Sequence, residues 1–351
     1  MSKHRQDFKS LLGTELPVIQ SPMAGVQAHG LALAVCEAGG LGSLPGAMLS
    51  PEALQRELTA LATGTSRPYN LNFFCHTLVA PNNTAEQAWR DALAPFYQRW
   101  QLPADQVNAA AMRTPFSHDL ADLIAPFKPP VVSFHFGLPA PDLLARVKAW
   151  GATVLASATT VDEARWLQAR GADAVIAQGL EAGGHRGHFL RDDLGAQMGT
   201  LALVPQVVAA IDLPVIAAGG IADAAGVAAA QALGASAVQV GTVFLLCPEA
   251  HTTTLHRAAL QGPGARHTEI TRLFTGRPAR SIVNALMREL GAMNPLAPAF
   301  PTAASALAPL RAAAELAGIS DFTPLWAGQN TSGCRAVAAA EITRALAAGW
   351  R

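Results

Sequence analysis

The densest cluster of side chains that could do chemistry lies between residues 178 and 188, in the segment QGLEAGGHRGH. It contains five polar residues, which are Gln178, Glu181, His185, Arg186 and His188. A glycine-rich backbone beside a histidine is typical of a loop shaped around a flat or phosphorylated ligand. A neutral imidazole can remove a carbon-bound proton, because its unperturbed pKa lies near neutrality. We therefore predict a functional role for His185, whereas His188 fits better as a helix cap or as a partner for buried backbone.

Two glycine phrases follow two neighbouring predicted strands later in the chain. Gly219 and Gly220 stand in AAGGIAD, and Gly241 and Thr242 stand in VQVGTVF. Glycine lets backbone N–H groups approach phosphate oxygens, and a helix N-terminus favours an anion. Each phrase alone is also typical of a tight turn between a strand and a helix. Two such phrases after adjacent strands predict a phosphate-binding site.

Polar side chains also occur in two earlier predicted strands. The period of two places Asn70 and Asn72 of YNLNFFCH on one face. An amide inside an apolar strand needs a hydrogen-bond partner, so these residues face a ligand or bridge layers of the core. Asn72 lies nearer the C-terminal end of the strand and is the better ligand candidate. His135, at the end of VVSFH, either faces the site and contacts substrate or is a satisfied core histidine.

Several classes of chemistry are disfavoured by what the chain lacks. Its four lysines are Lys3, Lys9, Lys128 and Lys148, and none follows a predicted strand. A Schiff-base aldolase needs a desolvated lysine at such a place. There is no HExxH motif and no carboxylate–histidine cluster at ligand spacing, so we expect no metal.

Composition and charge narrow the class of protein further. The chain has 351 residues, half of them hydrophobic and only 14% charged, which excludes a disordered chain. Its 25 basic and 25 acidic residues cancel, so no net charge steers it to nucleic acid or to an anionic membrane. The four cysteines are far apart, the N-terminus is polar, and no apolar run is long enough to span a membrane. We expect a soluble cytoplasmic protein.

Short apolar runs alternate with Ala- and Leu-rich helical segments along the chain. Eight predicted strands cover residues 17–22, 41–44, 69–74, 131–134, 153–157, 174–177, 214–218 and 237–241. The clearest helices cover 161–170 and 222–233. Three helix exits repeat one pattern, AWGATVLAS, ARGADAVIA and ALGASAVQV, in which Gly ends a helix and a buried strand follows. The repeat favours an α/β fold of the (β/α)8 TIM barrel type, with an open doubly wound sheet as the alternative.

Two regions interrupt the regular spacing of strands and helices. One is a long insertion at about residues 75–130, after the third strand. The other, residues 251–324, follows the eighth strand. Both leave C-terminal ends of strands, where barrel enzymes build their sites. We predict one barrel domain made of residues 1–250 and 325–351, including that insertion, and a substrate-covering segment made of residues 251–324.

Five segments in order resemble the nitronate monooxygenase family, and NFFCH with EAGGHRG resembles its class I branch. They are VIQSPMAGV, NLNFFCH, GLEAGGHRG, AAGGIAD and QVGT, and the match runs from about residue 16 to residue 242. WAGQ at 326–329 is a further similar segment. The resemblance implies a flavoprotein barrel that holds FMN non-covalently and without a metal. The glycine phrases after the last two strands agree with an FMN phosphate, although they do not by themselves identify a flavin.

The resemblance also implies residue roles by position. Those implied to contact the flavin ring are Pro22, Met23, Ala24, Asn72, Gln178, Gly183 and Gly184. Those implied to hold its phosphate end are Ala218, Gly219, Gly220, Gln239, Val240, Gly241 and Thr242. His185 matches the catalytic histidine of the family.

The implied activity is FMN-dependent oxidation of alkyl nitronates, such as propionate 3-nitronate, by O2 to a carbonyl compound plus nitrite or nitrate, a detoxifying reaction. The chain departs from members that use tyrosine or lysine around a carboxylated substrate. It has two tyrosines, and residues 251–324 hold neither residue type. Arg272, Arg277, Arg280 or the apolar Phe300 would have to serve instead.

Two other functions remain open at this point. One is a flavin-dependent NAD(P)H reductase acting on a quinone or an enoyl thioester, because related barrels share the glycine phrases. The other is a non-redox phosphate-binding barrel. In the leading interpretation the partners are a small-molecule nitronate and O2, with no nucleic acid and no membrane, and the protein is a monomer or a homodimer.

Overall fold

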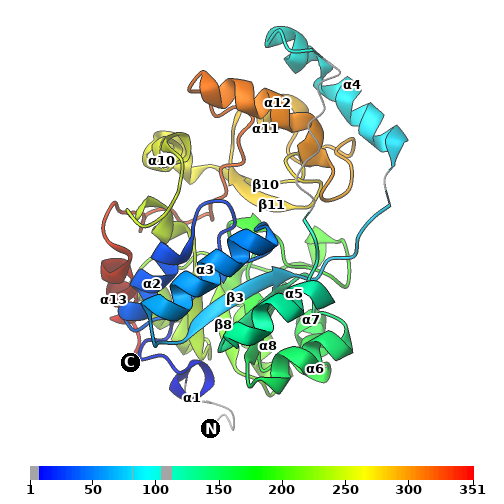
Figure 1. The fold of residues 1–351 in the computed structure, drawn as a ribbon. Coiled ribbons are helices and arrows are strands. Elements are labelled where there is room, and N and C mark those ends of the chain that lie inside the picture. Colours follow the sequence, from blue (N-terminus) through cyan, green and yellow to red (C-terminus); the bar gives the residue numbers. More distant parts are fainter. Residues whose placement is uncertain (1–7, 81, 104–112) are drawn as a thin grey trace.

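Eight parallel strands form a barrel at the centre of the protein (Figure 1), whose computed structural model describes residues 8–80, 82–103 and 113–351. The barrel strands are β1 (Val18–Gln20), β2 (Gly42–Pro45), β3 (Tyr69–Phe74), β4 (Val131–His135), β5 (Thr153–Ala158), β6 (Ala174–Gln178), β8 (Val215–Ala218) and β9 (Ala237–Val240). Their order is β1-β9-β8-β6-β5-β4-β3-β2, and a parallel bridge between Ile19 and Leu41 joins β1 to β2. The predicted (β/α)8 barrel is confirmed, and the open-sheet alternative is wrong.

The barrel interior is filled by side chains from alternate strand positions. Ile19, Leu155 and Ile216 are fully buried and pack with Leu11 and Leu12 of the short helix α1 (Phe8–Leu12). Burial of apolar side chains on both faces explains why the strands read as continuous apolar runs. The hydrophobic core therefore continues to the N-terminal end of the barrel, where α1 packs on it.

Buried amides in β3 bridge neighbouring strands. Asn70 Nδ2 donates to Ser43 Oγ at 2.9 Å, and Asn72 Nδ2 donates to Ser133 Oγ at 3.0 Å. Because an unpaired buried amide is costly, these bonds explain how the strand tolerates two asparagines. Of the two roles open for Asn70, its amide nitrogen performs the bridging one.

Helices surround the barrel on the outside. They are α2 (His29–Glu37), α3 (Pro51–Gly64), α5 (His118–Ile124), α6 (Pro141–Ala149), α7 (Val161–Ala169), α8 (Thr200–Ala210), α9 (Ala224–Ala232) and α13 (Ala339–Ala347), with the 3₁₀ turn η1 (Ala125–Phe127). The three repeated exits place Gly151, Gly171 and Gly234 at φ of 89°, 91° and 97°, which is the left-handed region that favours glycine. The clearest predicted helices, 161–170 and 222–233, are each slightly shorter in the structure.

A second layer lies over the end of the barrel where the strands terminate (Figure 1). It contains α4 (Asn83–Arg99), α10 (Thr254–Gln261), η4 (Pro263–Arg266), β10 (Thr268–Thr271), β11 (Ala279–Ile282), α11 (Ala285–Leu290) and α12 (Ala303–Leu316). Helix α4 comes from the long insertion, yet it packs on α12: Trp89 Nε1 donates to the Ala303 carbonyl at 3.1 Å, and Tyr97 OH donates to that of Ala306 at 2.7 Å. The layer therefore combines both irregular regions around its own apolar core.

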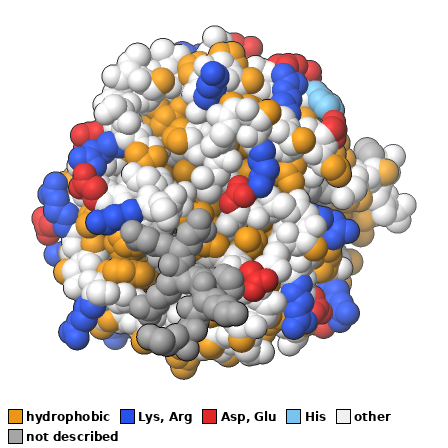
Figure 2. Space-filling view, turned by 90° about the horizontal axis from the view of Figure 1, so that it is seen from below, with side chains coloured by type: hydrophobic (Ala, Val, Ile, Leu, Met, Phe, Trp, Pro, Cys, Tyr) orange, Lys and Arg blue, Asp and Glu red, His pale blue; other side chains and the backbone are white. Residues whose placement is uncertain are grey.

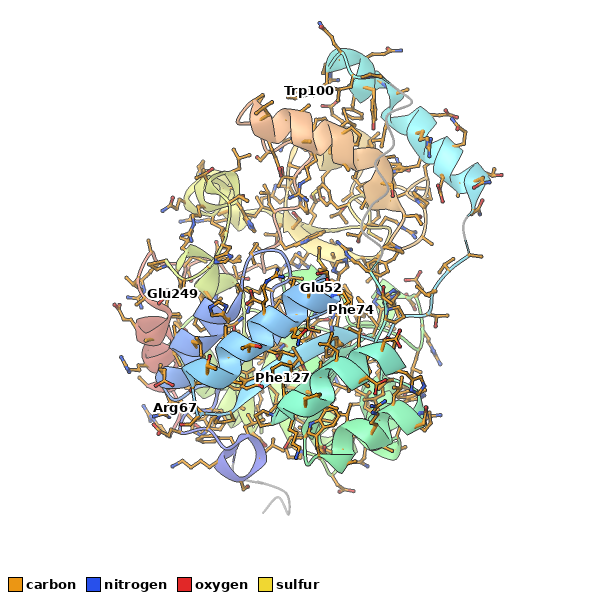
Figure 3. All side chains as sticks on the ribbon, in the orientation of Figure 1. Glu52, Arg67, Phe74, Trp100, Phe127 and Glu249 are labelled. Carbon is orange, nitrogen blue, oxygen red and sulfur yellow. The ribbon has the colours of Figure 1, made fainter. Side chains whose placement is uncertain are left out.

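Side chains mark the two limits of this upper layer. Trp100 lies at its outer end, and Phe74, at the end of β3, lies where the layer meets the barrel (Figure 3). Phe74 and Phe300 belong to one buried cluster, so the covering residues reach the strand ends directly. Whether residues 251–324 cover a substrate stays a prediction.

A small sheet connects the upper layer with the loop after β6. Its order is β10-β11-β7, where β7 is the two-residue strand Gly184–His185. His185 pairs with Ala279, and Gly184 pairs with Arg280. A bridge between Ser281 and Trp326 adds the segment after α12 to the same framework. The backbone of His185 is therefore held in a sheet and is not part of a free loop.

The protein surface carries both signs of charge. On the face seen in Figure 2, Lys and Arg side chains are interspersed with Asp and Glu, in keeping with equal numbers of basic and acidic residues in the chain. Among the described residues, no helix is both long and apolar enough to cross a membrane.

Candidate active site

His185 lies between the barrel and the upper layer, and three residues fix its position. Its Nε2 is 2.9 Å from the hydroxyl oxygen of Thr275, which belongs to the covering residues. Its carbonyl oxygen accepts hydrogen bonds from Gln178 Nε2 at 3.0 Å and from His135 Nε2 at 3.3 Å. The side chain and the backbone of His185 are thus both anchored, which favours one orientation of the imidazole.

His135 is bound by protein groups at both ring nitrogens. Its Nδ1 lies 3.0 Å from Ser157 Oγ, and its Nε2 faces the His185 carbonyl. Because a carbonyl only accepts, Nε2 carries the proton and Nδ1 accepts from the serine hydroxyl. These contacts make His135 a support for the His185 backbone, and a direct contact with substrate stays a prediction.

Four aromatic rings surround the imidazole of His185. Their ring centroids lie 5.5 to 6.3 Å from its own, and they belong to Phe74, Phe136, Phe300 and Trp326. Phe136 has φ of 71°, which is unusual for a residue with a bulky side chain and is typical of functional sites. This enclosure excludes water from one side of His185 and offers flat apolar surfaces to a ligand.

Burial keeps the histidines of this enclosure neutral. It lowers the pKa of His185 well below its usual value, and the nearby guanidinium of Arg113 lowers that pKa further. Burial also lowers the pKa of His135 to about 3 and that of His76 to about 4. At neutral pH each imidazole therefore has one unprotonated ring nitrogen. That of His135 already accepts from Ser157, whereas a general base requires a nitrogen whose lone pair is free.

The other polar residues of the 178–188 cluster hold the loop in place. Gln178 Oε1 accepts from Gly187 N at 2.8 Å, and its Nε2 donates to the His185 carbonyl. The Gln178 amide therefore binds the loop backbone on both sides of Arg186. The fully buried Arg186 donates to the Gly179 and Gln178 carbonyls at 2.7 and 2.8 Å. His188 Nε2 lies 3.1 Å from Asp192 Oδ1. This contact is neither a helix cap nor a bond to backbone, so the predicted structural role of His188 stays a prediction.

Glu181 has a role that its position in the cluster did not reveal. Its carboxylate accepts from both Thr200 N and Thr200 Oγ1 at 2.9 Å, at the first turn of α8. A carboxylate at a helix N-terminus satisfies amides that the helix leaves unpaired. Glu181 therefore fixes the loop to α8 and is not free for acid–base chemistry.

The two glycine phrases, Gly219–Gly220 and Gly241–Thr242, lie at the ends of the paired strands β8 and β9, so they form neighbouring parts of one surface, the glycine cradle. Gly219 and Gly220 have φ of 116° and 72°, and a Cβ on Gly219 would come within 2.8 Å of Thr200 Oγ1. Among the described residues, the N–H groups of Gly219, Gly220 and Gly241 donate to no protein acceptor. Exposed amides in this arrangement suit an anion. No helix follows the glycine pair directly, because α9 begins at Ala224 after the capping Asp223.

The predicted flavin residues of three separate segments lie together around this surface. A Cβ on Gly241 would lie 3.5 Å from Met23 Sδ, which places residues 22–24 beside η3 (Thr242–Leu246). The WAGQ segment, residues 326–329, also lies beside Thr242, since Gly328 N donates to Thr242 Oγ1 at 2.9 Å. A Cβ on Gly183 would lie 2.6 Å from the backbone of Ala327. The roles of these residues toward a flavin stay predictions.

Two buried groups were missed by sequence reasoning. Thr275 contacts His185 across a separation of 90 residues, and Arg113 lies in the long insertion with its guanidinium 5.3 Å from the ring centroid of Phe300. Neither residue stands in a recognisable motif, so no local signal could have identified it.

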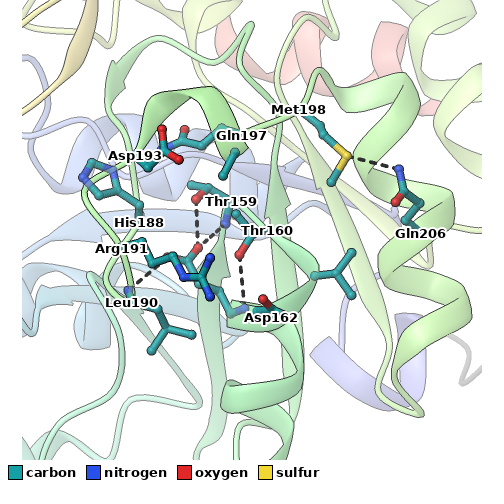
Figure 4. A pocket seen from close by; sticks show the side chains of 13 residues that line it. Thr159, Thr160, Asp162, His188, Leu190, Arg191, Asp193, Gln197, Met198 and Gln206 are labelled. Atoms are coloured by element: carbon teal, nitrogen blue, oxygen red, sulfur yellow. Dashed lines mark hydrogen bonds between the residues drawn. The ribbon is translucent and has the colours of Figure 1, made fainter.

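A separate cavity of about 240 Å³ lies beside the 188–198 loop, between η2 (Leu194–Ala196) and the start of α7 (Figure 4). None of the predicted cofactor residues lines it. Within its wall, Glu163 accepts from Thr159 N at 2.7 Å and from Phe189 N at 2.6 Å. The buried carboxylate therefore ties the loop that follows His185 to the outside of the barrel.

Comparisons with known proteins cover nearly the whole chain. The family model described as "Nitronate monooxygenase" matches residues 5–349. A nitronate monooxygenase of Pseudomonas aeruginosa is 43% identical over 345 residues, covering 97% of both chains. The solved structure of a nitroalkane oxidase from Streptomyces ansochromogenes is 40% identical, with a TM-score of 0.88 and 97% of both chains covered.

A more distant solved structure shares the same architecture. FabK from Thermotoga maritima is 29% identical, with a TM-score of 0.72 and coverage of 97% of this chain and 94% of its own. The family match likewise extends over both the barrel and the upper layer. The order of the five predicted segments, the barrel and these likenesses agree, and the chain belongs to the nitronate monooxygenase family.

Proposed function

We propose that this protein uses FMN and O2 to oxidise alkyl nitronates, such as propionate 3-nitronate, to a carbonyl compound plus nitrite or nitrate. The observation that carries this proposal is the neutral, doubly anchored His185 in an aromatic enclosure next to a glycine cradle. The family relationship supports the reaction class. In this proposal the enzyme detoxifies small nitronates in the cytoplasm as a monomer or homodimer.

The residues present fit the phosphate end of FMN. The unbonded amides of Gly219, Gly220 and Gly241 offer several donors to a dianion. Gln239 Oε1 is buried without a protein partner among the described residues. A buried polar atom of this kind is expected to hydrogen-bond a ligand. We propose that these residues hold the phosphate and ribityl part, while residues 22–24, Asn72, Gln178, Gly183 and Gly184 face the ring.

Bound FMN would supply the redox chemistry, accepting electrons from the substrate and passing them to O2. The protein itself contributes binding, orientation and exclusion of water. The rings of Phe136, Phe300 and Trp326 form apolar walls, and the anchored His185 stands among them. Small flat substrates fit such an enclosure.

His185 performs a different task for each protonation state of the substrate. A nitronate has already lost its α-proton, so the imidazole needs only to hydrogen-bond its anionic nitro group. A neutral nitroalkane must first lose the proton, and the free ring nitrogen Nδ1 can take it. The Thr275 hydroxyl supports both tasks, because a hydroxyl donates to or accepts from Nε2.

The second candidate function is a flavin-dependent NAD(P)H reductase acting on a quinone or an enoyl thioester. The likeness to FabK, at a TM-score of 0.72, shows that the architecture is not restricted to one member of the wider group. A pyridine nucleotide would need room along the flavin, where Phe300 and Trp326 pack close to His185. This crowding favours a small substrate.

Steady-state oxygen consumption tests the proposal. The purified protein, reconstituted with FMN, should consume O2 with propionate 3-nitronate and release nitrite or nitrate. Consumption with NADH and a quinone, but not with any nitronate, would support the reductase instead. Protein that binds no flavin would point to the non-redox alternative.

A further inference from the structure

A segment from the C-terminal part of the chain lies against both halves of the glycine cradle. Gly328 N donates to Thr242 Oγ1 at 2.9 Å, and Asn330 Nδ2 donates to the Gly220 carbonyl at 3.0 Å. The two bonds join residues that are 86 and 110 positions apart in the chain. The cradle is therefore built from three parts of the sequence, and the third is the segment of residues 328–330.

Two hydrogen bonds fix the orientation of the Asn330 side-chain amide. Its Oδ1 accepts from Ser332 N at 3.2 Å and from Ser332 Oγ at 2.7 Å. Because a backbone N–H only donates, the atom that faces it must be the amide oxygen, and the amide nitrogen is left to face Gly220. An asparagine side chain that bonds the backbone two residues on closes a turn of its own. This turn consists of protein groups alone, so it presents the Nδ2 donor to the cradle without help from a ligand.

A bond to the Gly220 carbonyl also sets the direction of the next backbone amide. The Gly220–Ile221 peptide bond is trans, and in a planar trans peptide the C=O and N–H bonds point in opposite directions. The Ile221 N–H therefore points away from Asn330, and it donates to no protein acceptor among the described residues. It directly follows the free N–H groups of Gly219 and Gly220, whose φ values are positive. Successive free amides of this kind suit an anion.

The preceding carbonyl of this turn, that of Gly219, has a partner that is shared. It lies 2.9 Å from Thr200 Oγ1, which is equally close to the Glu181 carboxylate. A hydroxyl has one proton, so Thr200 can donate to only one of these acceptors at a time. Asn330 Nδ2, by contrast, bonds to no other acceptor among the described residues. The last peptide of the turn is thus the one with a donor of its own.

The same segment orients a donor in the second glycine phrase. Thr242 Oγ1 accepts from Gly328 N, and the proton of this hydroxyl has no protein acceptor in the described part of the chain. The hydroxyl is therefore free to donate to a ligand, next to the free N–H of Gly241. Residues 328–330 thus act on both phrases in the same sense, because each contact leaves a donor available to an anion.

We propose that Asn330 is a positioning residue of the phosphate site, which holds the Gly220–Ile221 peptide so that its N–H faces the FMN phosphate. The inference rests on the proposed function, because that function supplies the phosphate. It makes the affinity for the phosphate depend on the C-terminal segment and not on the two glycine phrases alone. Asn330 acts through the backbone and does not itself touch the phosphate.

The test compares FMN with riboflavin, which has the same ring and ribityl chain but no phosphate. The full-length protein is freed of flavin, and the Kd of each flavin is measured by fluorescence titration. FMN should bind to the unmodified protein at least about 10-fold more tightly than riboflavin, because only FMN bonds to the cradle. Asn330→Ala should raise the Kd for FMN by about 10-fold and that for riboflavin by less than about 2-fold.

The matched control is Asn294→Ala, because Asn294 forms the same kind of turn outside the cradle. Its Oδ1 accepts from Leu296 N, two residues on, at 2.9 Å, and its Nδ2 donates to the Leu290 carbonyl at 2.8 Å. This variant should bind both flavins as the unmodified protein does. Equal FMN binding by the two alanine variants would overturn the inference.

Asn330→Asp is a second variant that keeps the acceptor for Ser332 but turns an oxygen toward the Gly220 carbonyl. It should weaken FMN binding at least as much as alanine does, since an ionised carboxylate only accepts. An unchanged Kd for FMN in this variant would overturn the inference even if Asn330→Ala does not fold.

The remaining outcomes separate the inference from the proposed function. Equal weakening of FMN and riboflavin in the Asn330 variants would overturn the inference, because the residue would then support the fold and not the phosphate. Equal affinity of the unmodified protein for the two flavins would overturn it as well. A protein that binds neither flavin would refute the proposed function and the inference together, whereas selective loss of FMN in Asn330→Ala would support the inference whatever substrate is oxidised.

Discussion

The imidazole Nε2 of His185 and the hydroxyl oxygen of Thr275 lie 2.9 Å apart, although 90 residues separate them in the chain. The contact joins the loop after β6 to the residues that cover the barrel. It leaves Nδ1 as the nitrogen of His185 without a protein partner among the described residues. Thr275 is therefore a positioning residue that acts through the histidine.

Thr275→Val should lower kcat/KM for a nitroalkane by about 5- to 10-fold, the cost of one hydrogen bond that orients the base. FMN content should not change, because Thr275 does not contact the glycine cradle. Thr275→Ser keeps the hydroxyl and should retain the rate. Steady-state kinetics on flavin-replete protein measures both variants, and equal rates for valine and serine would contradict a positioning role.

His185→Asn should reduce nitroalkane turnover by ~10²–10⁴-fold, which is the usual contribution of a general base. Turnover of a preformed nitronate should fall less, because only hydrogen bonding and orientation are lost. Both substrates are measured with one preparation at equal FMN content. Equal losses would make the imidazole a positioning group for both substrates, and unchanged rates would make it structural.

Gly220→Val should lower the FMN content of the purified protein. The residue has φ of 72°, which disfavours a β-branched side chain, and a Cβ there would lie 3.3 Å from Glu181 Cβ, so the backbone or Glu181 must move. Gly264→Val is the control, because a Cβ at that exposed position meets no atom within 4 Å. The flavin released on heating is quantified by mass spectrometry. Full FMN occupancy in Gly220→Val would place the phosphate elsewhere.

Stability should decrease as pH falls from about 6.5 toward 4. Burial lowers the pKa of His135 to about 3 and that of His76 to about 4, so in this interval the unfolded chain binds protons that the folded protein does not. Each such histidine contributes a slope of at most about 1.4 kcal/mol per pH unit. Removing one of them should therefore flatten the dependence.

The variant for this measurement is His135→Gln, which keeps a donor and an acceptor. Urea unfolding at several pH values between about 7 and 5 gives the free energy of unfolding. The variant should be less stable than the original protein at pH 7 and should lose less stability on acidification. An identical pH dependence in both proteins would show that His135 is not held neutral by the fold.

Local patterns were sufficient to predict much of this architecture. Continuous apolar runs located all eight barrel strands, three of them after a repeated glycine exit from a helix, because each βα unit is stabilised mainly by contacts close in sequence. The same local reasoning singled out His185 and the glycine pairs, since they directly follow strands whose ends converge.

Long-range contacts could not be predicted in the same way. The pairing of β7 with β11 and the packing of α4 on α12 depend on residues far apart in sequence. Arg113 reaches the enclosure only because the insertion folds back over the barrel. For Gln178 and Arg186, the sequence pattern predicted a place in the polar cluster after β6 but not the role in supporting the loop. Loop support and ligand binding require the same polar side chains.

Anaerobic mixing of the FMN-loaded protein with propionate 3-nitronate tests the central claim most directly. If the protein oxidises nitronates, the substrate alone should bleach the visible absorbance of the flavin rapidly, and admission of O2 should restore it with release of nitrite or nitrate. NADH, mixed in the same way, should bleach it far more slowly. Fast bleaching by NADH with none by the nitronate would contradict the account and identify the protein as a reductase.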